Sequence, residues 1–219
     1  MLGSVPDQAL ASWTERMMTK GQLQKTVIDL VTRLTGATKS ESEKAPPWLV
    51  RPGKMECGHQ WTLVQEIYTA LTGLTLPDVM PKREWRWLDA VLVHDSAAPR
   101  ILEVDEAQHF NKFRAVTLSL YTGDIRLAFD AQRFLCASKS KSRLESGRFG
   151  RPCPPLFPGD GGRHRQRAFR DALVDILPIQ YDYAPTLRIA HFEVENWILS
   201  HEAEDRMRAL LEDRLKVNL

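Results

Sequence analysis

Hydrophobic positions along the chain recur mainly at spacings of three and four, which predicts a fold rich in amphipathic helices. The spacing is clearest in the second half of residues 7–35, where Val27, Leu30, Val31 and Leu34 share one face. Gly36 follows as a plausible helix end. The pattern predicts five helical regions: residues 7–35 (as two helices), 63–74, 111–120, 163–177 and 195–216.

Alternating and β-branched residues predict strands in the middle and late parts of the chain. Trp85–His94 and Arg100–Asp105 are separated only by the turn segment 95–99, so we expect them to pair as an antiparallel hairpin. Asp124–Phe129 is predicted as a short strand and Thr186–Val194 as a late core strand. These elements together indicate the α/β class.

Two stretches without clear periodicity divide the chain. Residues 37–54 are rich in Ser, Lys, Glu and Pro, which is typical of a linker or a surface loop. Residues 137–162 are dense in Ser, Gly and Pro and are predicted as one long loop. We therefore expect an N-terminal helical extension with its linker at 1–56 and an α/β domain at 57–219.

Composition excludes several classes of protein. The 219 residues are 43% hydrophobic and 26% charged, which is ordinary for a folded globular chain. No apolar run approaches the roughly 18 residues that span a bilayer, and Met1–Ala9 shows no secretory signal pattern. Three scattered cysteines are too few for a disulfide framework. We expect a cytoplasmic protein without a membrane partner.

Charge is distributed unevenly, although the formal net charge is only +2. Residues 137–170 hold nine Lys or Arg against two acids, whereas residues 193–213 hold seven acids against two arginines. A basic surface of this kind attracts phosphates and gives salt-dependent binding, although a solvated basic face is the alternative interpretation. The predicted nucleic-acid contacts share this basic segment: Lys139, Lys141, Arg143, Arg163, Arg167 and Arg170.

An acidic cluster at the predicted hairpin is the main candidate for chemistry. Glu103 and Asp105 are two residues apart on one strand, so they project from the same face. In a tight hairpin, Asp89 lies opposite one of them, where paired Cβ atoms are roughly 4.5–5.5 Å apart. Three carboxylates this close repel one another unless a cation neutralises them. Oxygen ligands favour Mg²⁺, with Mn²⁺ as the alternative.

Other polar residues flank this cluster. Glu66 lies on the edge of the preceding helix, and Gln108 and His109 follow the strand. His109 is a candidate proton acceptor or donor because the ordinary histidine pKa is about 6.5. Acids at strand ends are often simply solvated, and a lone histidine is often structural. Cys57 and His59 lack a second ligand pair, so zinc is not expected.

In their order and spacing, these residues resemble the PD-(D/E)xK nuclease superfamily. The helix with Glu66, then Arg86–Leu92 with Asp89, then Ile101–Phe110 with Glu103, Asp105 and His109 carry the likeness. The nearest branch is that of the very short patch repair endonuclease. The resemblance implies a restriction-endonuclease-like core, a central mixed sheet flanked by helices. It also implies Mg²⁺-dependent phosphodiester hydrolysis, with Asp89, Glu103 and Asp105 as metal ligands.

The sequence departs from the superfamily pattern at two positions. Asp105 stands where the usual Lys would be, and Glu106 replaces a common glycine. Lys112 or Gln108 is the candidate substitute for the Lys. The leading hypothesis is a nuclease acting on DNA in repair or defence. Two alternatives remain open: a nuclease-fold domain that binds nucleic acid without cutting it, and a subunit that binds a protein partner or forms a homo-oligomer.

Overall fold

The computed structural model describes residues 20–39, 44–50, 52–81, 86–141, 144 and 150–216. The first of the two helices expected in residues 7–35 falls largely outside these residues, as does Arg143. The second is present as α1 (Lys20–Thr35), and Gly36 follows it with a φ of +66° that favours glycine.

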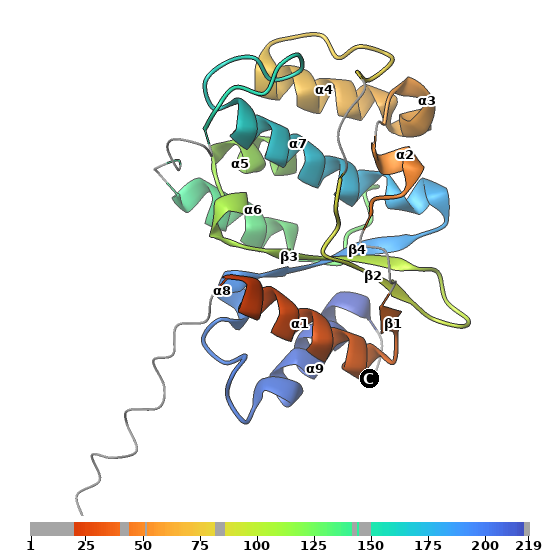
Figure 1. Ribbon diagram of the computed structural model, residues 1–219, viewed down its shortest axis with the longest axis vertical. Coiled ribbons are helices and arrows are strands. Elements are labelled where there is room, and N and C mark those ends of the chain that lie inside the picture. The colour runs from red at the N-terminus through yellow and green to blue at the C-terminus, as the bar shows by residue number, and fades with distance from the viewer. Residues whose placement is uncertain are drawn as a thin grey trace, which may run out of the picture.

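A four-stranded mixed sheet forms the centre of the molecule (Figure 1). Its spatial order follows the chain: β1 (Thr38–Lys39), β2 (Ala90–Val93), β3 (Arg100–Asp105) and β4 (Ala184–Ala190). The first three strands are antiparallel, and β4 joins β3 in parallel. The predicted hairpin and the mixed sheet are therefore confirmed, although β2 is shorter than the predicted strand Trp85–His94.

Helices cover both faces of the sheet (Figure 1). One face carries α1 and α9 (Ala203–Leu215). The other carries the larger layer, whose helices are α2 (Pro47–Val50), α3 (Lys54–Cys57), α4 (Trp61–Thr72), α5 (Lys112–Ser119), α6 (Ala131–Ser140) and α7 (Gly162–Ile176). This is the α/β architecture with a flanked mixed sheet that the sequence predicted.

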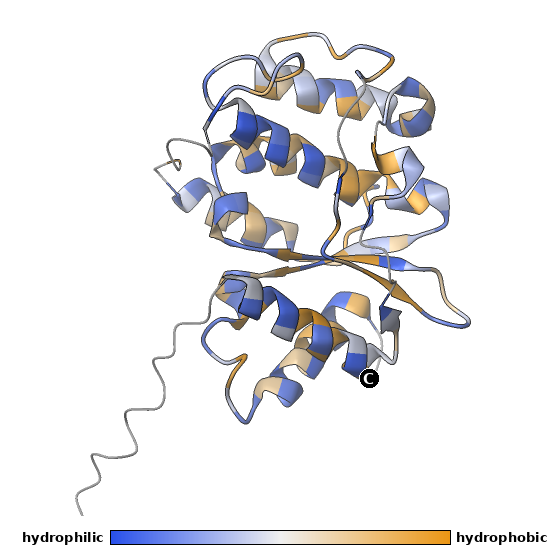
Figure 2. Cartoon of the chain, viewed as in Figure 1, coloured by the Kyte–Doolittle hydropathy of each residue, from blue (hydrophilic) through white to orange (hydrophobic). Residues whose placement is uncertain are grey.

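Alternation along β3 decides which side chains face which layer. Leu102 and Val104 join the hydrophobic cluster formed with α1 and α9, and Ile101 joins the cluster formed with α4 and α7. Glu103 and Asp105, on the Ile101 side by the same alternation, therefore point toward the larger helical layer. Figure 2 shows the apolar colour concentrated on the sheet and on the inward sides of the helices.

The N-terminal helix is packed as part of this core. Val27 and Val31 of α1 are fully buried in the same cluster as Leu102, Met207 and Leu211. The predicted linker also contributes: Ala45 and Leu49 are buried, and β1 extends the sheet. The described parts of residues 20–50 thus supply part of one helical layer and one edge strand of the sheet rather than standing apart from it.

Three expected elements differ in the structure. Residues 124–129 form no strand. Their one pairing with the sheet is an isolated bridge from Ala128 to Leu187 of β4. The strand expected at Thr186–Val194 ends at Ala190, where the Glu193 carboxylate accepts the Ala190 N–H and starts α8 (His191–Val194). The segment expected as one loop at 137–162 begins inside α6.

A cap and an aromatic contact explain why α6 extends into the basic segment. The Asp130 side chain accepts the Arg133 N–H at the start of the helix, and Phe134 is fully buried. The basic residues near its end lie on the outside, so they do not prevent the helix from packing. The density of Ser, Gly and Pro over 137–162 therefore misidentified the last turn of this helix as loop.

Candidate metal centre

Asp89 reaches the strand that carries Glu103 at the point where the β2–β3 ladder ends. The last paired residues are Ala90 and Leu102, so a continued register would place Asp89 opposite Glu103. At this point a carboxylate oxygen of Asp89, rather than a backbone carbonyl, accepts the Val104 N–H at 2.7 Å. The other Asp89 oxygen accepts the Gln24 amide of α1 at 2.8 Å. The predicted approach of Asp89 to the Glu103 strand is confirmed.

The surroundings of Asp89 and Glu103 disfavour the charged form of both carboxyl groups. Burial, with a further contribution from Asp105, raises the pKa of Asp89 to about 6. Burial and the charge of Asp89 raise the pKa of Glu103 well above its ordinary value. Among the described residues, no donor forms a hydrogen bond with the Glu103 carboxylate. A partly buried carboxylate beside a second acid, with no donor of its own, is suited to bind a cation.

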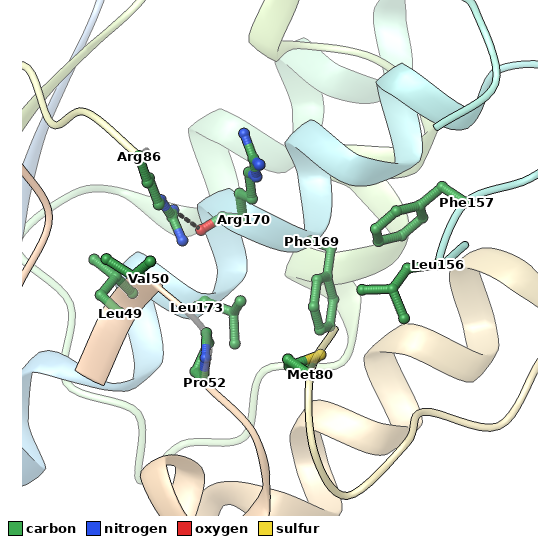
Figure 3. Close-up of a pocket in the computed structure, with 10 residues that line it drawn as sticks. All are labelled: Leu49, Val50, Pro52, Met80, Arg86, Leu156, Phe157, Phe169, Arg170 and Leu173. Atoms are coloured by element: carbon green, nitrogen blue, oxygen red, sulfur yellow. Dashed lines mark hydrogen bonds between the residues drawn. The ribbon is translucent and has the colours of Figure 1, made fainter. Parts of the chain in front are cut away.

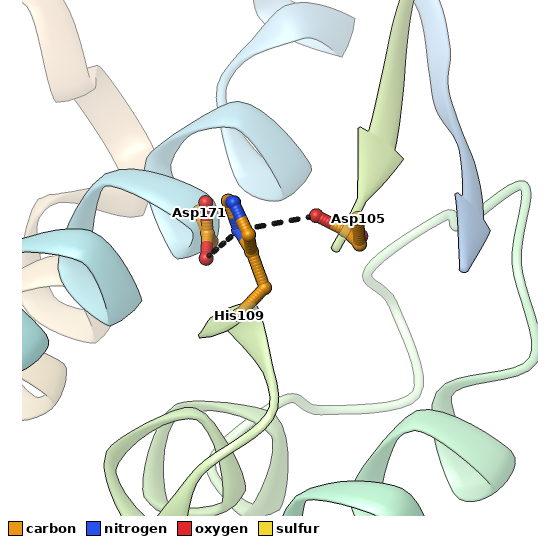
Figure 4. A group of neighbouring side chains, drawn as sticks. All are labelled: Asp105, His109 and Asp171. Carbon is orange, nitrogen blue, oxygen red and sulfur yellow. Dashed lines mark hydrogen bonds and ion pairs between the residues drawn. The ribbon is translucent and has the colours of Figure 1, made fainter. Parts of the chain in front are cut away.

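The tightest group of potential ligands is a different one. Asp105, His109 and Asp171 each offer one ligand atom, and these atoms lie within 4.8 Å of one another (Figure 4). Among the described residues, Asp89, Glu103 and Asp105 do not form such a compact group. Figure 4 shows His109 between the two aspartates, with Nδ1 at 3.1 Å from Asp171 and 3.2 Å from Asp105.

Asp105 already has a cationic partner. Arg188 of β4 is fully buried, and its Nη1 lies 2.7 and 2.9 Å from the two Asp105 carboxylate oxygens. The expectation that only a metal ion could neutralise the whole acidic cluster is therefore wrong for Asp105. A guanidinium from the neighbouring strand does so.

A network of buried charges extends from Arg188 away from the hairpin. Its Nε donates to Asp175 of α7 at 2.5 Å, and Asp175 also accepts Nη2 of Arg114 at 2.7 Å and the Tyr121 hydroxyl at 2.6 Å. The Arg188, Asp175 and Arg114 side chains are at most 1% exposed. Burial would lower the pKa of Arg188, but Asp105 and Asp175 hold it well above its ordinary value. This network fixes α5 and α7 against β4.

His109 is held by its two aspartates. Burial alone would lower its pKa, but Asp171 and Asp105 outweigh burial and raise it. Burial would raise the pKa of Asp171, yet His109 and Arg188 hold it well below its usual range. Among the described residues, Nε2 of His109 has no hydrogen-bond partner, and the side chain is 21% exposed. The ring is thus oriented through Nδ1, and Nε2 is left to exchange a proton.

The remaining predicted site residues lie farther from the acids. Glu66 is on the exposed side of α4, and Lys112 is exposed at the start of α5, with its ammonium 5.3 Å from the ring of Phe113. Gln108 donates its side-chain amide to Glu106 at 2.5 Å. The structure does not bring Glu66 or Lys112 into the hydrogen-bond network of the carboxylates.

Two of the predicted basic residues reach the short helical turn η3 (Ala107–His109), which carries His109. Lys141 donates to the carbonyl of Ala107 at 2.8 Å, and Arg167 donates to that of Gln108 at 3.2 Å. Arg163 bonds Gln166 at 2.5 Å, whereas Lys139 is exposed on α6 and Arg143 lies outside the described residues. The basic segment therefore adjoins the acidic site.

Arg170 lies instead beside an apolar cavity between α2, α7 and the loop before α7 (Figure 3). Its backbone carbonyl accepts Nη2 of Arg86 at 2.6 Å. The cavity holds about 30 Å³, which is room for one or two waters rather than for a substrate. It is a packing gap, and we assign no binding role to it.

Sequence reasoning missed the residues that complete the site. Asp171 and Asp175 are four apart on α7 and interrupt its apolar face, and Arg188 is the one charged residue of a mainly apolar core strand. Charges at buried positions of two neighbouring elements are the signal that could have found them, because such charges must be paired.

Comparisons with known proteins add no relative: no family model, no curated protein and no solved structure matches this chain. Within the described residues, none of the helices combines the length and apolarity needed to span a membrane.

Proposed function

We propose that this protein is a divalent-metal-dependent nuclease that hydrolyses phosphodiester bonds, with DNA as its substrate in repair or defence. The observation that carries the proposal is the pair Asp89 and Glu103. Asp89 accepts the N–H of Val104, the residue after Glu103 on β3, and its charge acts on Glu103, which has no hydrogen-bond donor among the described residues. Two such groups fit Mg²⁺ or Mn²⁺, which prefer oxygen ligands.

The surroundings of the pair support hydrolysis of a phosphodiester. A bound Mg²⁺ would supply Lewis-acid stabilisation of the charge that develops on the phosphate. His109, oriented by Asp171 through Nδ1, presents Nε2 for proton exchange with the leaving oxygen or the attacking water. Lys141 and Arg167, next to η3, would hold substrate phosphates near His109. The sheet topology agrees with the resemblance at the level of a flanked mixed sheet.

One observation favours a second function, a domain that binds nucleic acid without cutting it. The position where the superfamily has its Lys is occupied by Asp105, and Asp105 is neutralised by Arg188. Lys112, the candidate substitute, is exposed on α5. A protein of this kind would keep the basic surface and lose turnover. Binding to a protein partner, homo-oligomer formation and cytoplasmic location remain predictions from the sequence.

A plasmid-nicking assay tests the proposal. Supercoiled DNA is incubated with the protein in Mg²⁺, in Mn²⁺ and in EDTA. We expect nicking only with a divalent ion, and a loss of at least about 100-fold for Glu103→Gln. Glu66→Gln is the matched control, since Glu66 is an exposed acid on α4, and it should retain activity within about twofold.

Salt-sensitive DNA binding by the wild-type protein without metal-dependent nicking would overturn the nuclease proposal and support the binding domain. DNA affinity that does not respond to salt would argue against both and favour a protein partner.

A further inference from the structure

Arg188 is the most completely paired side chain near the candidate site. Its Nη1 contacts both oxygens of Asp105, its Nε donates to Asp175, and its Nη2 donates to the backbone carbonyl of Asp171 at 3.1 Å. The side chain is 0% exposed. It therefore cannot reach a substrate in this arrangement, and its role must be exerted through the residues that it holds.

Asp105 is enclosed between two cationic or proton-bearing groups. Arg188 lies on one side, and Nδ1 of His109 lies 3.2 Å from its Oδ1 on the other. The Asp105 side chain is 2% exposed. Both Asp105 oxygens accept from a buried guanidinium, so a metal ion here would have to lie against the positive charge of Arg188 or displace it. Within the described part of the chain, the Asp89 oxygens accept only neutral donors, the Val104 N–H and the Gln24 amide, and keep lone pairs for a cation.

Glu103 has different hydrogen bonding from Asp105, although it lies only two residues before it on β3. It is the register partner of Arg188 across β3 and β4, yet the guanidinium donates to Asp105 and Asp175. The acidic cluster is thus divided. Asp105, Asp171 and Asp175 form close ion pairs, whereas among the described residues Glu103 and Asp89 form none and feel Arg86 and Arg188 only at longer range.

We infer that Arg188 is a permanent counter-ion of Asp105 and keeps this carboxylate from binding a metal ion. Asp105 then only positions His109, and the metal ion is bound by Asp89 and Glu103. This inference rests on the proposed function for the presence of a metal ion, and it changes the ligand set that the sequence predicted. It identifies Arg188 and Asp105 as positioning residues. It also gives a reason for the group Asp105, His109 and Asp171 to stay free of metal although its ligand atoms are close together.

Mn²⁺ binding to the full chain tests the inference without relying on activity. The loss of the free Mn²⁺ signal in electron paramagnetic resonance gives affinity and stoichiometry. We expect one Mn²⁺ per wild-type chain, an affinity within about threefold for Asp105→Asn, and a weakening of at least about 30-fold for Glu103→Gln. Asp105→Asn is close in shape and keeps one acceptor oxygen for Arg188.

An equal weakening for Asp105→Asn and Glu103→Gln would overturn the inference and leave the nuclease proposal intact. A wild-type chain that binds no Mn²⁺ would overturn both. Binding that follows our expectation, together with an absence of nicking, would support the inference and remove the nuclease function.

A second arm tests Arg188 directly. We expect Arg188→Gln to bind a second Mn²⁺, because Asp105 and Asp171 lose their counter-ion, whereas Arg188→Lys keeps one. A folded Arg188→Gln chain with a single ion of unchanged affinity would contradict the counter-ion role. If Arg188→Gln does not fold, the comparison of Asp105→Asn with Glu103→Gln decides the inference by itself.

Discussion

Glu103 and Arg188 are directly paired in the register of β3 and β4, yet the Arg188 guanidinium donates to Asp105 and Asp175 instead. The neighbouring carboxylates thereby receive the hydrogen bonds of the buried guanidinium, and Glu103 is left beside Asp89 without an ion pair among the described residues. The proposed metal site depends on this division between ion-paired acids and acids without an ion pair.

The first prediction concerns pH and stability. Because the pKa of Asp89 is raised to about 6 in the folded chain, the folded state binds this proton more tightly than the unfolded state. Stability is therefore lost as pH rises from about 4 to above 6. In EDTA we expect the acid pair to cost on the order of 2 kcal/mol between pH 5 and pH 8. Glu103→Gln should reduce this loss, because the raised pKa of Glu103 itself contributes to it.

Urea unfolding of both proteins at pH 5 and pH 8 measures the difference. The raised pKa of His109 gives a dependence of the same sign, but it is common to both proteins and cancels in the comparison. Mn²⁺ should restore wild-type stability at pH 8 and have little effect at pH 5. Identical pH dependence in the two proteins would show that the Glu103 carboxyl does not contribute to the loss of stability at high pH.

The second prediction concerns the buried charge network. Arg114 and Asp175 are ion-paired at 2.7 Å with at most 1% exposure, so Arg114→Met leaves a buried carboxylate with fewer partners. We expect a destabilisation of about 3–5 kcal/mol. Arg208→Ala removes an exposed ion pair with Glu204 and should cost less than about 1 kcal/mol. Thermal unfolding of the two variants gives the contrast, and similar costs would mean that the network contributes little.

The third prediction concerns the basic surface. If Arg167 and Lys141 contact phosphates, replacing either with Ala should weaken DNA binding uniformly and reduce the slope of log affinity against log salt by about 1. Arg206→Ala is the control, because Arg206 is an exposed arginine on α9, across the sheet. Fluorescence anisotropy over a salt series measures the slopes. A slope unchanged by Arg167→Ala would remove this residue from the interface.

The fourth prediction concerns the layer formed by α1 and α9. Met207 is fully buried against the sheet, so Met207→Ala should cost about 2–5 kcal/mol through lost contacts and a cavity. Met55 is 91% exposed, and Met55→Ala should stay within about 0.5 kcal/mol. Equal effects in denaturant unfolding would mean that this layer is not part of the cooperative core.

The sequence predicted the sheet and the acids where a local rule was sufficient. Alternation placed Glu103 and Asp105 on one face, and the short turn at 95–99 set the register that brings Asp89 close. Helical periodicity found α7 and most of α1 for the same reason. These features depend on neighbouring residues along the chain or across one tight turn.

The partners of the acids could not be predicted in this way. Arg188 contacts Asp105 only because β4 returns parallel to β3 after about 80 residues. Asp171 contacts His109 only because α7 packs beside the end of β3 and the turn that follows it. Glu66 shows the reverse error: its place beside an apolar stripe suggested a site residue, but the face that it occupies is exposed. Long-range packing determined which charges are paired.

The most direct test of the central claim is diffraction from crystals soaked in Mn²⁺, recorded for anomalous scattering. The account predicts one peak within about 2.3 Å of carboxylate oxygens from both Asp89 and Glu103. A peak confined to the group Asp105, His109 and Asp171, or no peak at all, would contradict it.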